Sequence, residues 1–200
     1  MPAEAPLAAL VLAGGRSVRM QRDKATLAFA GQTQLARAMQ LVGSLCAQAF
    51  VSVRPDQRGD PERARWPQVV DEIADIGPAA GILAAQARLP DHAWLVVAVD
   101  LPLLDAATLA RLLAARQSTA LATAFRSSSD GLPEPLCAIW EPASRAPLAA
   151  FVDGGRSCPR KFLITHAAHL VELEAPAALA NVNTPDDYAA ALAARPETAP

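Results

Sequence analysis

The sequence predicts an α/β fold whose central sheet is mainly parallel. Short apolar runs alternate with longer stretches of helical periodicity, which is the pattern of strands connected by crossover helices. The run Trp94–Val99 contains no charged residue and therefore reads as an interior strand that is covered on both faces. It ends at Asp100, so a carboxylate follows the carboxyl end of that strand.

The first half of the chain supplies the parallel part of the expected sheet. The expected strands are Leu7–Leu12, Phe50–Val53, Gln68–Val70 and Trp94–Val99. The helices have recognisable first residues. Thr33 is suited to cap a helix that runs to about Ala47, Pro78 takes the first position of a helix that runs to about Arg88, and Asp105 caps the next one.

After about residue 117 the pattern loosens. Ala120–Phe125 and Leu136–Trp140 are expected strands, and the polar turn Arg126–Gly131 lies between them. Because this link is not helical, we expect an antiparallel departure from the sheet. The remaining expected helices are Pro147–Val152, Pro159–Ile164 and one that Thr184 caps.

Composition and charge narrow the class of protein. The 200 residues suit one domain, expected over residues 1–195 with a frayed tail over 196–200. A net charge of −2 provides no general positive field, so binding to nucleic acid or to an anionic membrane is not expected. The three cysteines form no CxxC pair, and no apolar run reaches the roughly 20 residues of a membrane span. We therefore expect a cytoplasmic protein with reduced thiols.

The segment that follows the first strand is the most informative for function, because open α/β sheets bind ligands at such places. Gly14 and Gly15 allow the backbone to approach an anion closely and to present successive N–H groups. Arg16, Arg19 and Lys24 add positive charge, a combination that suits a triphosphate. The segment is not a Walker A loop, because no Gly-Lys-Ser/Thr closes it, and it is not the GxGxxG loop of dinucleotide-binding proteins.

Four segments together carry a family resemblance. The first is Leu-Ala-Gly-Gly-Arg-Ser-x-Arg-Met, which begins at Leu12, with Asp23-Lys24 after it. The others are Gly77-Pro78-Ala79-Ala80-Gly81-Ile82, Val99-Asp100-Leu101-Pro102 and Asn181-Val182-Asn183-Thr184-Pro185-Asp186-Asp187. Taken in this order over nearly the whole chain, they resemble the motifs of the molybdenum cofactor guanylyltransferase family, a MobA-like group of nucleotidyltransferases.

The resemblance implies a Rossmann-like three-layer αβα sandwich and a Mg²⁺-dependent nucleotidyl transfer. GTP is the favoured donor, and the phosphate of molybdopterin is the implied acceptor. Pyrophosphate leaves, and the product is a guanine dinucleotide cofactor. The resemblance also implies transient contact with molybdoenzymes or their chaperones.

The resemblance and the chemistry of the residues together assign the site. The expected catalytic residues are Lys24, Arg19 and Asp100, with Asp100 as the Mg²⁺ ligand at the end of an interior strand. The nucleotide is expected to contact Leu12, Ala13, Gly14, Gly15, Arg16, Arg19, Lys24, Asp71, Pro78 and Gly81. The residues expected to support the acceptor or the metal are Asn181, Asn183, Arg156, Arg160 and Lys161.

Each of these assignments has a structural alternative. Asp100 is also a suitable capping residue before Pro102, and Asp71 is equally acceptable as a solvated loop acid. The two asparagines before Thr184 are common turn formers. The basic cluster over residues 156–161 is also typical of a solvated surface.

Two departures from the family pattern keep other functions open. Gln21 stands where the family usually has Gly, and Arg54 stands near a position where guanylyl-transferring relatives often carry Asn, which weakens the assignment of GTP. The alternatives are a cytidylyltransferase of the same pathway, a sugar- or alditol-phosphate nucleotidyltransferase, and a nucleotide-binding protein without catalysis. Asn181 and Asn183 favour the guanylyl group, since cytidylyl relatives tend to carry Asp there.

Overall fold

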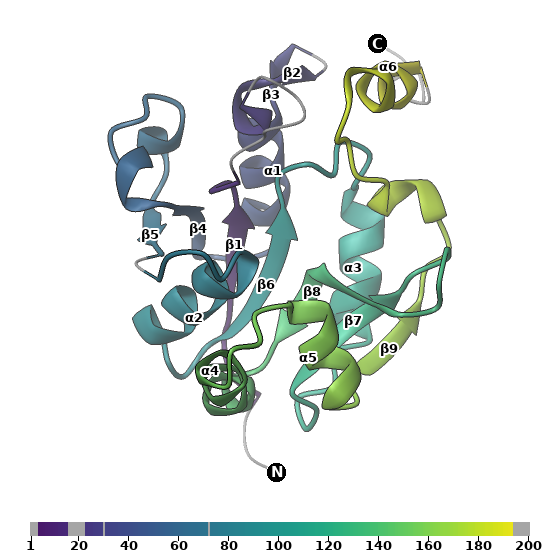
Figure 1. Ribbon diagram of the computed structural model, residues 1–200. Coiled ribbons are helices and arrows are strands. Elements are labelled where there is room, and N and C mark those ends of the chain that lie inside the picture. The colour runs from purple at the N-terminus through teal and green to yellow at the C-terminus, as the bar shows by residue number, and fades with distance from the viewer. Residues whose placement is uncertain (1–3, 16–22, 30, 72, 194–200) are drawn as a thin grey trace.

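The computed structural model describes residues 4–15, 23–29, 31–71 and 73–193 (Figure 1). Its main sheet has seven strands in the order β5-β4-β1-β6-β8-β7-β9. The strands are β1 (Leu7–Leu12), β4 (Ala49–Val53), β5 (Gln68–Val70), β6 (Ala93–Ala98), β7 (Ala122–Arg126), β8 (Pro133–Trp140) and β9 (His169–Glu172). A separate two-stranded ribbon consists of β2 (Ala28–Phe29) and β3 (Gln32–Thr33).

The sheet is mainly parallel, as the sequence predicts. β5, β4, β1 and β6 pair in parallel, and so do β7 and β9. β8 pairs antiparallel with both β6 and β7. The expected antiparallel departure is therefore confirmed, and it has a topological consequence: β8 enters the sheet between β6 and β7.

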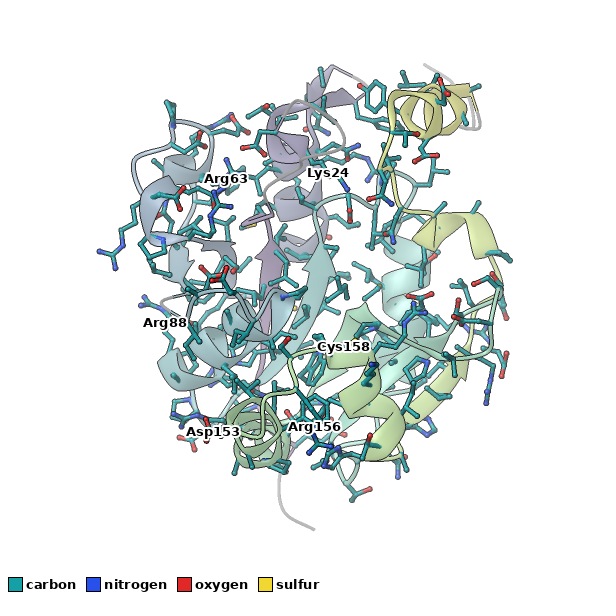
Figure 2. All side chains as sticks on the ribbon, in the orientation of Figure 1. Lys24, Arg63, Arg88, Asp153, Arg156 and Cys158 are labelled. Atoms are coloured by element: carbon teal, nitrogen blue, oxygen red, sulfur yellow. The ribbon has the colours of Figure 1, made fainter. Side chains whose placement is uncertain are left out.

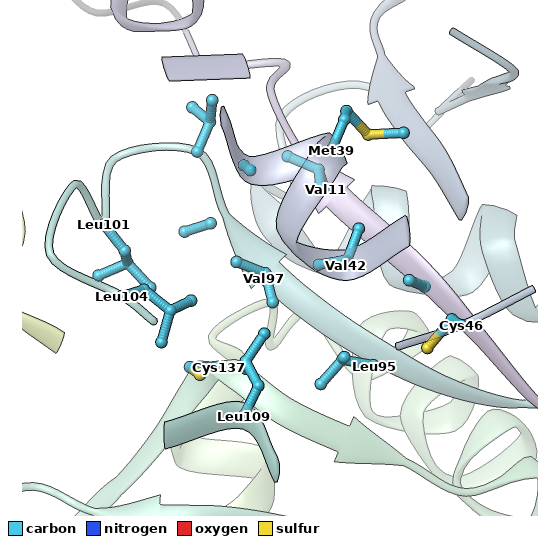
Figure 3. Close-up of a cluster of buried hydrophobic side chains, with 14 of the residues drawn as sticks. Val11, Met39, Val42, Cys46, Leu95, Val97, Leu101, Leu104, Leu109 and Cys137 are labelled. Atoms are coloured by element: carbon cyan, nitrogen blue, oxygen red, sulfur yellow. The ribbon is translucent and has the colours of Figure 1, made fainter. Parts of the chain in front are cut away.

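Helices cover both faces of this sheet, which confirms the three-layer arrangement (Figure 1). The helices are α1 (Gln34–Gly43), α2 (Pro78–Arg88), α3 (Ala106–Ala114), α4 (Arg145–Asp153), α5 (Pro159–Thr165) and α6 (Pro185–Ala193). Alternate residues of each strand point to opposite faces, so one sheet builds two apolar cores. Val11 and Val97 pack against Met39 and Val42 of α1 and Leu109 of α3 (Figure 3).

The opposite core is built from the intervening strand residues. Leu10 and Trp94 face α2, α4 and α5, and the same cluster contains Ile82, Phe151 and Phe162. Burial of such large side chains contributes about 1.5–3 kcal/mol each relative to exposure. This double coverage explains why β6 is buried along its whole length and reads as an uninterrupted apolar run.

Several element boundaries differ from those expected. α1 begins after its Thr33 cap as predicted but ends at Gly43 rather than about Ala47, since a turn follows at once. β8 begins at Pro133, three residues before the expected strand, because it has partners on both sides. β9 was not expected from the sequence, and it is a short edge strand with two exposed ends.

Two other expectations bear on the whole chain. Among the described residues, no helix combines the length and the apolar character that a bilayer crossing requires. The expected frayed tail over residues 196–200 lies outside the described residues, and the expected domain limits stay a prediction.

Candidate active site

The candidate site lies at the carboxyl edge of the parallel strands, where β1 and β6 end side by side. These strands pair in register as far as Leu12 and Ala98. The Val99 N–H then donates to the Leu12 carbonyl at 3.2 Å. The residues that follow, Gly14 after β1 and Asp100 after β6, therefore leave the sheet at neighbouring positions. Open α/β sheets bind their ligands at this kind of edge.

The Lys24 ammonium connects two other motifs at this edge. Its Nζ donates to Asp100 Oδ2 at 2.8 Å and to Asn183 Oδ1 at 2.7 Å. Figure 2 shows Lys24 above the ends of the central strands. The side chains of Lys24 and Asp100 are 16% and 22% exposed, so their contact is partly shielded from water. The structure brings these three predicted site residues together, and their catalytic roles stay predictions.

Local structure holds each of the three in place. Asp23 caps the short 3₁₀ helix η1 (Lys24–Thr26) by accepting from the Ala25 N–H at 3.0 Å. The Val182 N–H donates to the Asp100 carbonyl at 3.0 Å, which docks the C-terminal motif against the end of β6. Asp187 Oδ2 accepts from the Asn183 and Thr184 N–H groups at 2.9 Å each, so α6 fixes the backbone beside Asn183.

A second group of side chains surrounds Gly14. Arg54 follows β4, and its Nη1 donates to the Gly14 carbonyl. Its Nε and Nη2 donate to Asp56 at 3.0 Å each. A Cβ built on Gly14 would lie 3.6 Å from Asp71 Oδ2 and 3.7 Å from Gln57 Oε1. Glycine therefore leaves room between the strand end and these polar groups.

Asp71 is the titratable group of this second cluster with an altered pKa. Burial raises the pKa of its carboxyl from 3.8 to about 6, against the lowering effect of a backbone hydrogen bond and of Arg54. Its Oδ1 is buried and has no hydrogen-bond partner within the described part of the chain. A buried acceptor without a donor is destabilising, so the arrangement suits a ligand that brings a donor.

The segment Gly77–Ile82 leads into α2, the helix that Pro78 was expected to open. Gly77 has φ 59°, a left-handed value that favours glycine, and Pro78 then opens α2. Gly81 lies within α2, where a Cβ would come 2.5 Å from Ser52 Oγ and 2.8 Å from Leu12 Cδ2. The expected contact of Gly81 with the nucleotide stays a prediction. The lack of a side chain at Gly81 lets α2 pack closely on β1 and β4.

The predicted acceptor residues do not converge. Arg160 lines a cavity of about 350 Å³ together with Asp100, Asn181 and Pro78. It donates to Asp130 at 2.9 Å and to Glu134 at 2.8 Å.

The other two cationic residues of the 156–161 cluster lie elsewhere. The Arg156 guanidinium stacks over the Phe151 ring at 4.2 Å, and Lys161 is exposed on α5. Of the three, Arg160 is the one that lines the cavity next to Asp100.

Some predicted site residues lie outside the described part of the chain, namely Arg16 and Arg19, and so does Gln21. Of the backbone that was expected to border the base, Ala13 is buried and Leu12 is half-buried at the sheet edge. Cys137 and Cys158 also line the cavity. Burial raises the pKa of the Cys137 thiol far above its usual value, so it is protonated at neutral pH.

Two residues near the site were missed by the sequence analysis. Gln57 accepts from the Arg54 N–H at 3.1 Å and lies next to Gly14. Arg63 donates to the Ala13 carbonyl and to Asp23, and is one of the most deeply buried polar side chains (Figure 2). A local signal existed for Arg63: Asp60 stands three residues before it and pairs with it.

Comparison with known proteins places this geometry among the nucleotidyltransferases. The family model of the MobA-like NTP transferase domain matches residues 9–172. A molybdenum cofactor guanylyltransferase from Xanthomonas euvesicatoria pv. vesicatoria is 31% identical over 204 aligned positions, which cover 98% of this chain and all of the relative.

Two further matches extend the comparison. A molybdenum cofactor biosynthesis bifunctional protein from Synechocystis is 32% identical over 92% of this chain, and the chain spans 53% of that relative's length. The crystal structure of molybdopterin-guanine dinucleotide biosynthesis protein A from Archaeoglobus fulgidus superposes with a TM-score of 0.78 at 20% identity, covering 93% of this chain and 97% of the other. At this identity the structural match supports the fold alone.

Proposed function

Because the chain belongs to the MobA-like NTP transferase family and is a nucleotidyltransferase, we propose that it transfers GMP from Mg²⁺-bound GTP onto the phosphate of molybdopterin. Pyrophosphate is released, and the product is a guanine dinucleotide form of the cofactor. The observation that carries the proposal is the meeting of Lys24, Asp100 and Asn183, which come from three separate motifs.

This junction suits the chemistry of nucleotidyl transfer. A bond forms between an acceptor phosphate oxygen and the α-phosphorus while the bond from that phosphorus to pyrophosphate breaks. Such a reaction requires alignment and charge neutralisation and no covalent nucleophile on the protein. Lys24 is held by two oxygen acceptors in a partly buried place, so its ammonium is positioned before the substrate arrives. A preorganised donor of this kind stabilises charge that develops in the transition state.

The donor set of the junction also fits a Mg²⁺ ion. Asp100 supplies a carboxylate, of which Oδ2 is bound by Lys24, and Asn181 lines the same cavity as Asp100 and carries an amide oxygen. In the described ranges, no three His, Cys, Asp or Glu side chains gather as a metal cluster. Mg²⁺ typically binds one or two carboxylates and completes its shell with substrate phosphates and water. When bound, the ion would neutralise charge on the phosphate oxygens.

The Gly14 side of the site supports guanine as the base. Guanine presents its N1–H and 2-amino group as adjacent donors, which match the two oxygens of a carboxylate. Asp71 places such a carboxylate beside Gly14, with a buried Oδ1 that lacks a donor from the described residues. Arg54, the departure from the family pattern, binds the Gly14 carbonyl and Asp56. It therefore leaves Asp71 as the acceptor for the base.

The cavity next to Asp100 supports an acceptor site. The cavity has a volume of about 350 Å³ and is lined by Asp100, Asn181 and Arg160 among others. A phosphorylated acceptor in this cavity would present its phosphate toward Asp100 and Lys24. Arg160, oriented by Asp130 and Glu134, would provide a positive charge in the lining of this cavity.

The test is a comparison of the four nucleotides with molybdopterin as acceptor. We expect pyrophosphate release with GTP and Mg²⁺ to exceed that with CTP, ATP or UTP by at least about 100-fold, since a buried polar site left unpaired discriminates strongly. Turnover with CTP and none with GTP would identify a cytidylyltransferase instead. Tight binding of GTP without Mg²⁺-dependent turnover would support a nucleotide-binding protein without catalysis.

Two wider expectations belong to the same proposal. A cytoplasmic location and transient contact with molybdoenzymes or their chaperones stay predictions from the sequence. A sugar or alditol phosphate as acceptor is the remaining alternative within the fold, and replacing molybdopterin by such phosphates in the same assay separates the two.

A further inference from the structure

Arg63 is a charged side chain in an unusual place. It begins the 3₁₀ helix η3 (Arg63–Arg65) and is 1% exposed. Its Nη2 donates to the Ala13 carbonyl at 2.7 Å, and its Nε donates to the same oxygen at 3.2 Å. Nη1 lies 2.7 Å from Asp23 Oδ2 and 3.1 Å from Asp60 Oδ1. One guanidinium therefore joins a backbone carbonyl and two carboxylates.

The partners of Arg63 flank the expected phosphate-binding segment. Ala13 is the last residue before the glycine pair, and Asp23 is the residue before Lys24. The two are ten positions apart in the chain, and both bind the same side chain. Asp60 also accepts a hydrogen bond from the Arg63 backbone N–H at 3.0 Å, so Asp60 holds Arg63 itself in place. Arg63 thus fixes both ends of the segment that carries Gly14 and Gly15.

The contact between Arg63 and the Ala13 carbonyl also determines which way an N–H group of the glycine pair points. In a planar trans peptide, the carbonyl of one residue and the N–H of the next point in opposite directions. Because the Ala13 carbonyl points to Arg63, the Gly14 N–H points away from it. The Gly14 carbonyl points to Arg54 in the same way, so the Gly15 N–H points away from Arg54. Each of the two glycine N–H groups therefore points away from the arginine that binds the preceding carbonyl.

Stability alone does not explain a buried guanidinium. Replacing a buried ion pair by apolar side chains is often neutral or stabilising. A lysine would provide one point charge, whereas the planar fork of arginine provides several donors in fixed directions. Nε and Nη2 of Arg63 donate to the Ala13 carbonyl, while Nη1 pairs with Asp23, so these contacts use the fork.

We propose that Arg63 is a positioning residue for the nucleoside triphosphate: without touching the substrate, its guanidinium holds Ala13 and Asp23 and so orients the glycine pair and Lys24 toward the phosphates. The inference rests on the proposed function for the identity of the nucleotide. It does not depend on the acceptor.

The test uses four variants of the full-length protein. Arg63→Lys keeps the charge and removes the fork, and Asp23→Asn weakens the same contact from the other side. The third variant combines both changes. The matched control is Arg65→Lys on the same 3₁₀ helix, where the arginine is 59% exposed and pairs with Glu62. For each variant the melting temperature, the Kd of Mg²⁺-GTP by calorimetry and the KM values for GTP and for the acceptor are measured.

We expect Arg63→Lys to raise the Kd and the KM for GTP by about 10- to 100-fold, by analogy with residues that orient metal ligands through hydrogen bonds. The KM for the acceptor should change less than about twofold. Asp23→Asn should show the same selective loss, and the double variant should lose no more than about the larger single loss, because Asp23→Asn weakens a contact that Arg63→Lys already disrupts. Arg65→Lys should bind GTP as the wild type does.

The opposite pattern overturns the inference. A purely structural role would lower the melting temperature of Arg63→Lys while the folded protein still bound GTP with the wild-type Kd. Should Arg63→Lys fail to fold, wild-type binding by Asp23→Asn overturns it equally. If the wild type binds another triphosphate in place of GTP, the proposed function fails, and the same variants are then titrated with that triphosphate to decide the role of Arg63 separately.

Discussion

Gly81→Ala tests whether the close packing of α2 on the sheet defines this fold. Gly81 lies in the first half of α2, and a Cβ there would come 2.5 Å from Ser52 Oγ, 3.2 Å from Ser52 Cβ and 2.8 Å from Leu12 Cδ2. Ser52 is 1% exposed and has little freedom to move away. Ser52 and Leu12 lie near the ends of β4 and β1, so relief requires their side chains to rotate or α2 to shift from the sheet.

Two opposing effects set the size of the change. Adding a methyl group to a well-packed interface costs about 1–3 kcal/mol. Replacing glycine by alanine inside a helix gains about 1 kcal/mol in helix propensity. With contacts this short, overpacking exceeds the gain, and we expect a net loss of about 1–2 kcal/mol in the free energy of unfolding. For a chain of this size, that lowers the melting temperature by about 3–6 °C.

The assay is urea unfolding of Gly81→Ala beside Gly43→Ala. Gly43 ends α1, and a Cβ there would meet nothing within 4 Å, so this control should gain about 0.5 kcal/mol from the same chemical change. Adding Ser52→Gly to Gly81→Ala removes both contacts with Ser52 and should restore part of the difference between the two alanine variants. Equal stability of Gly81→Ala and Gly43→Ala would refute the packing argument.

Three further predictions concern the site. Lys24→Met should lower the single-turnover rate by on the order of 10²–10³, as for a lost transition-state donor, and a rate within threefold of the wild type would contradict the assignment. Burial raises the pKa of Asp71 to about 6, so the folded protein loses stability as pH rises from about 4 to 6. Asp71→Asn should therefore have a higher melting temperature than the wild type at pH 7.5 and the same melting temperature near pH 3.5. The variant should also bind GTP more weakly. An equal rise in melting temperature at both pH values would contradict this reasoning. Arg160→Met should raise the KM for the acceptor about tenfold and leave the KM for GTP unchanged, while the matched Arg156→Met, whose guanidinium stacks on a ring outside the cavity, should change neither.

Elements with strong local signals were predicted correctly from the sequence. Pro78 fixes the first residue of α2, and Asp105 caps α3 by accepting from the Thr108 N–H at 2.8 Å. Both depend on the backbone groups of one helix end, so a few neighbouring residues determine them. The limits of β8 depend instead on β6 and β7, which pair along its two edges. No local pattern contains that information.

The same distinction between local and long-range determinants applies to the site residues. Gly14, Asp100 and Asn183 stand directly after a strand or before a helix, and parallel strands end at one edge, so their proximity could be predicted. The close packing of Gly81 against the sheet could not be predicted, because a glycine in a turn and a glycine at a helix–sheet contact look alike in sequence. The structure distinguishes the two cases, because Ser52 of β4 and Leu12 of β1 lie against Gly81.

Arg63 shows most clearly where local reasoning stops. Asp60–Arg63 and Glu62–Arg65 are both ion pairs between residues three apart in the same short stretch. The local pattern is the same, yet Arg63 is 1% exposed and Arg65 is 59% exposed. The difference arises from Ala13 and Asp23, which lie 50 and 40 positions away in the chain. The same spacing cannot separate an anchored arginine from a solvated one when distant partners decide burial. The two arginines differ in function only if the contacts of Arg63 with Ala13 and Asp23 affect nucleotide binding. The comparison of Arg63→Lys with Arg65→Lys measures that difference directly, because the chemical change is identical and only the tertiary partners differ.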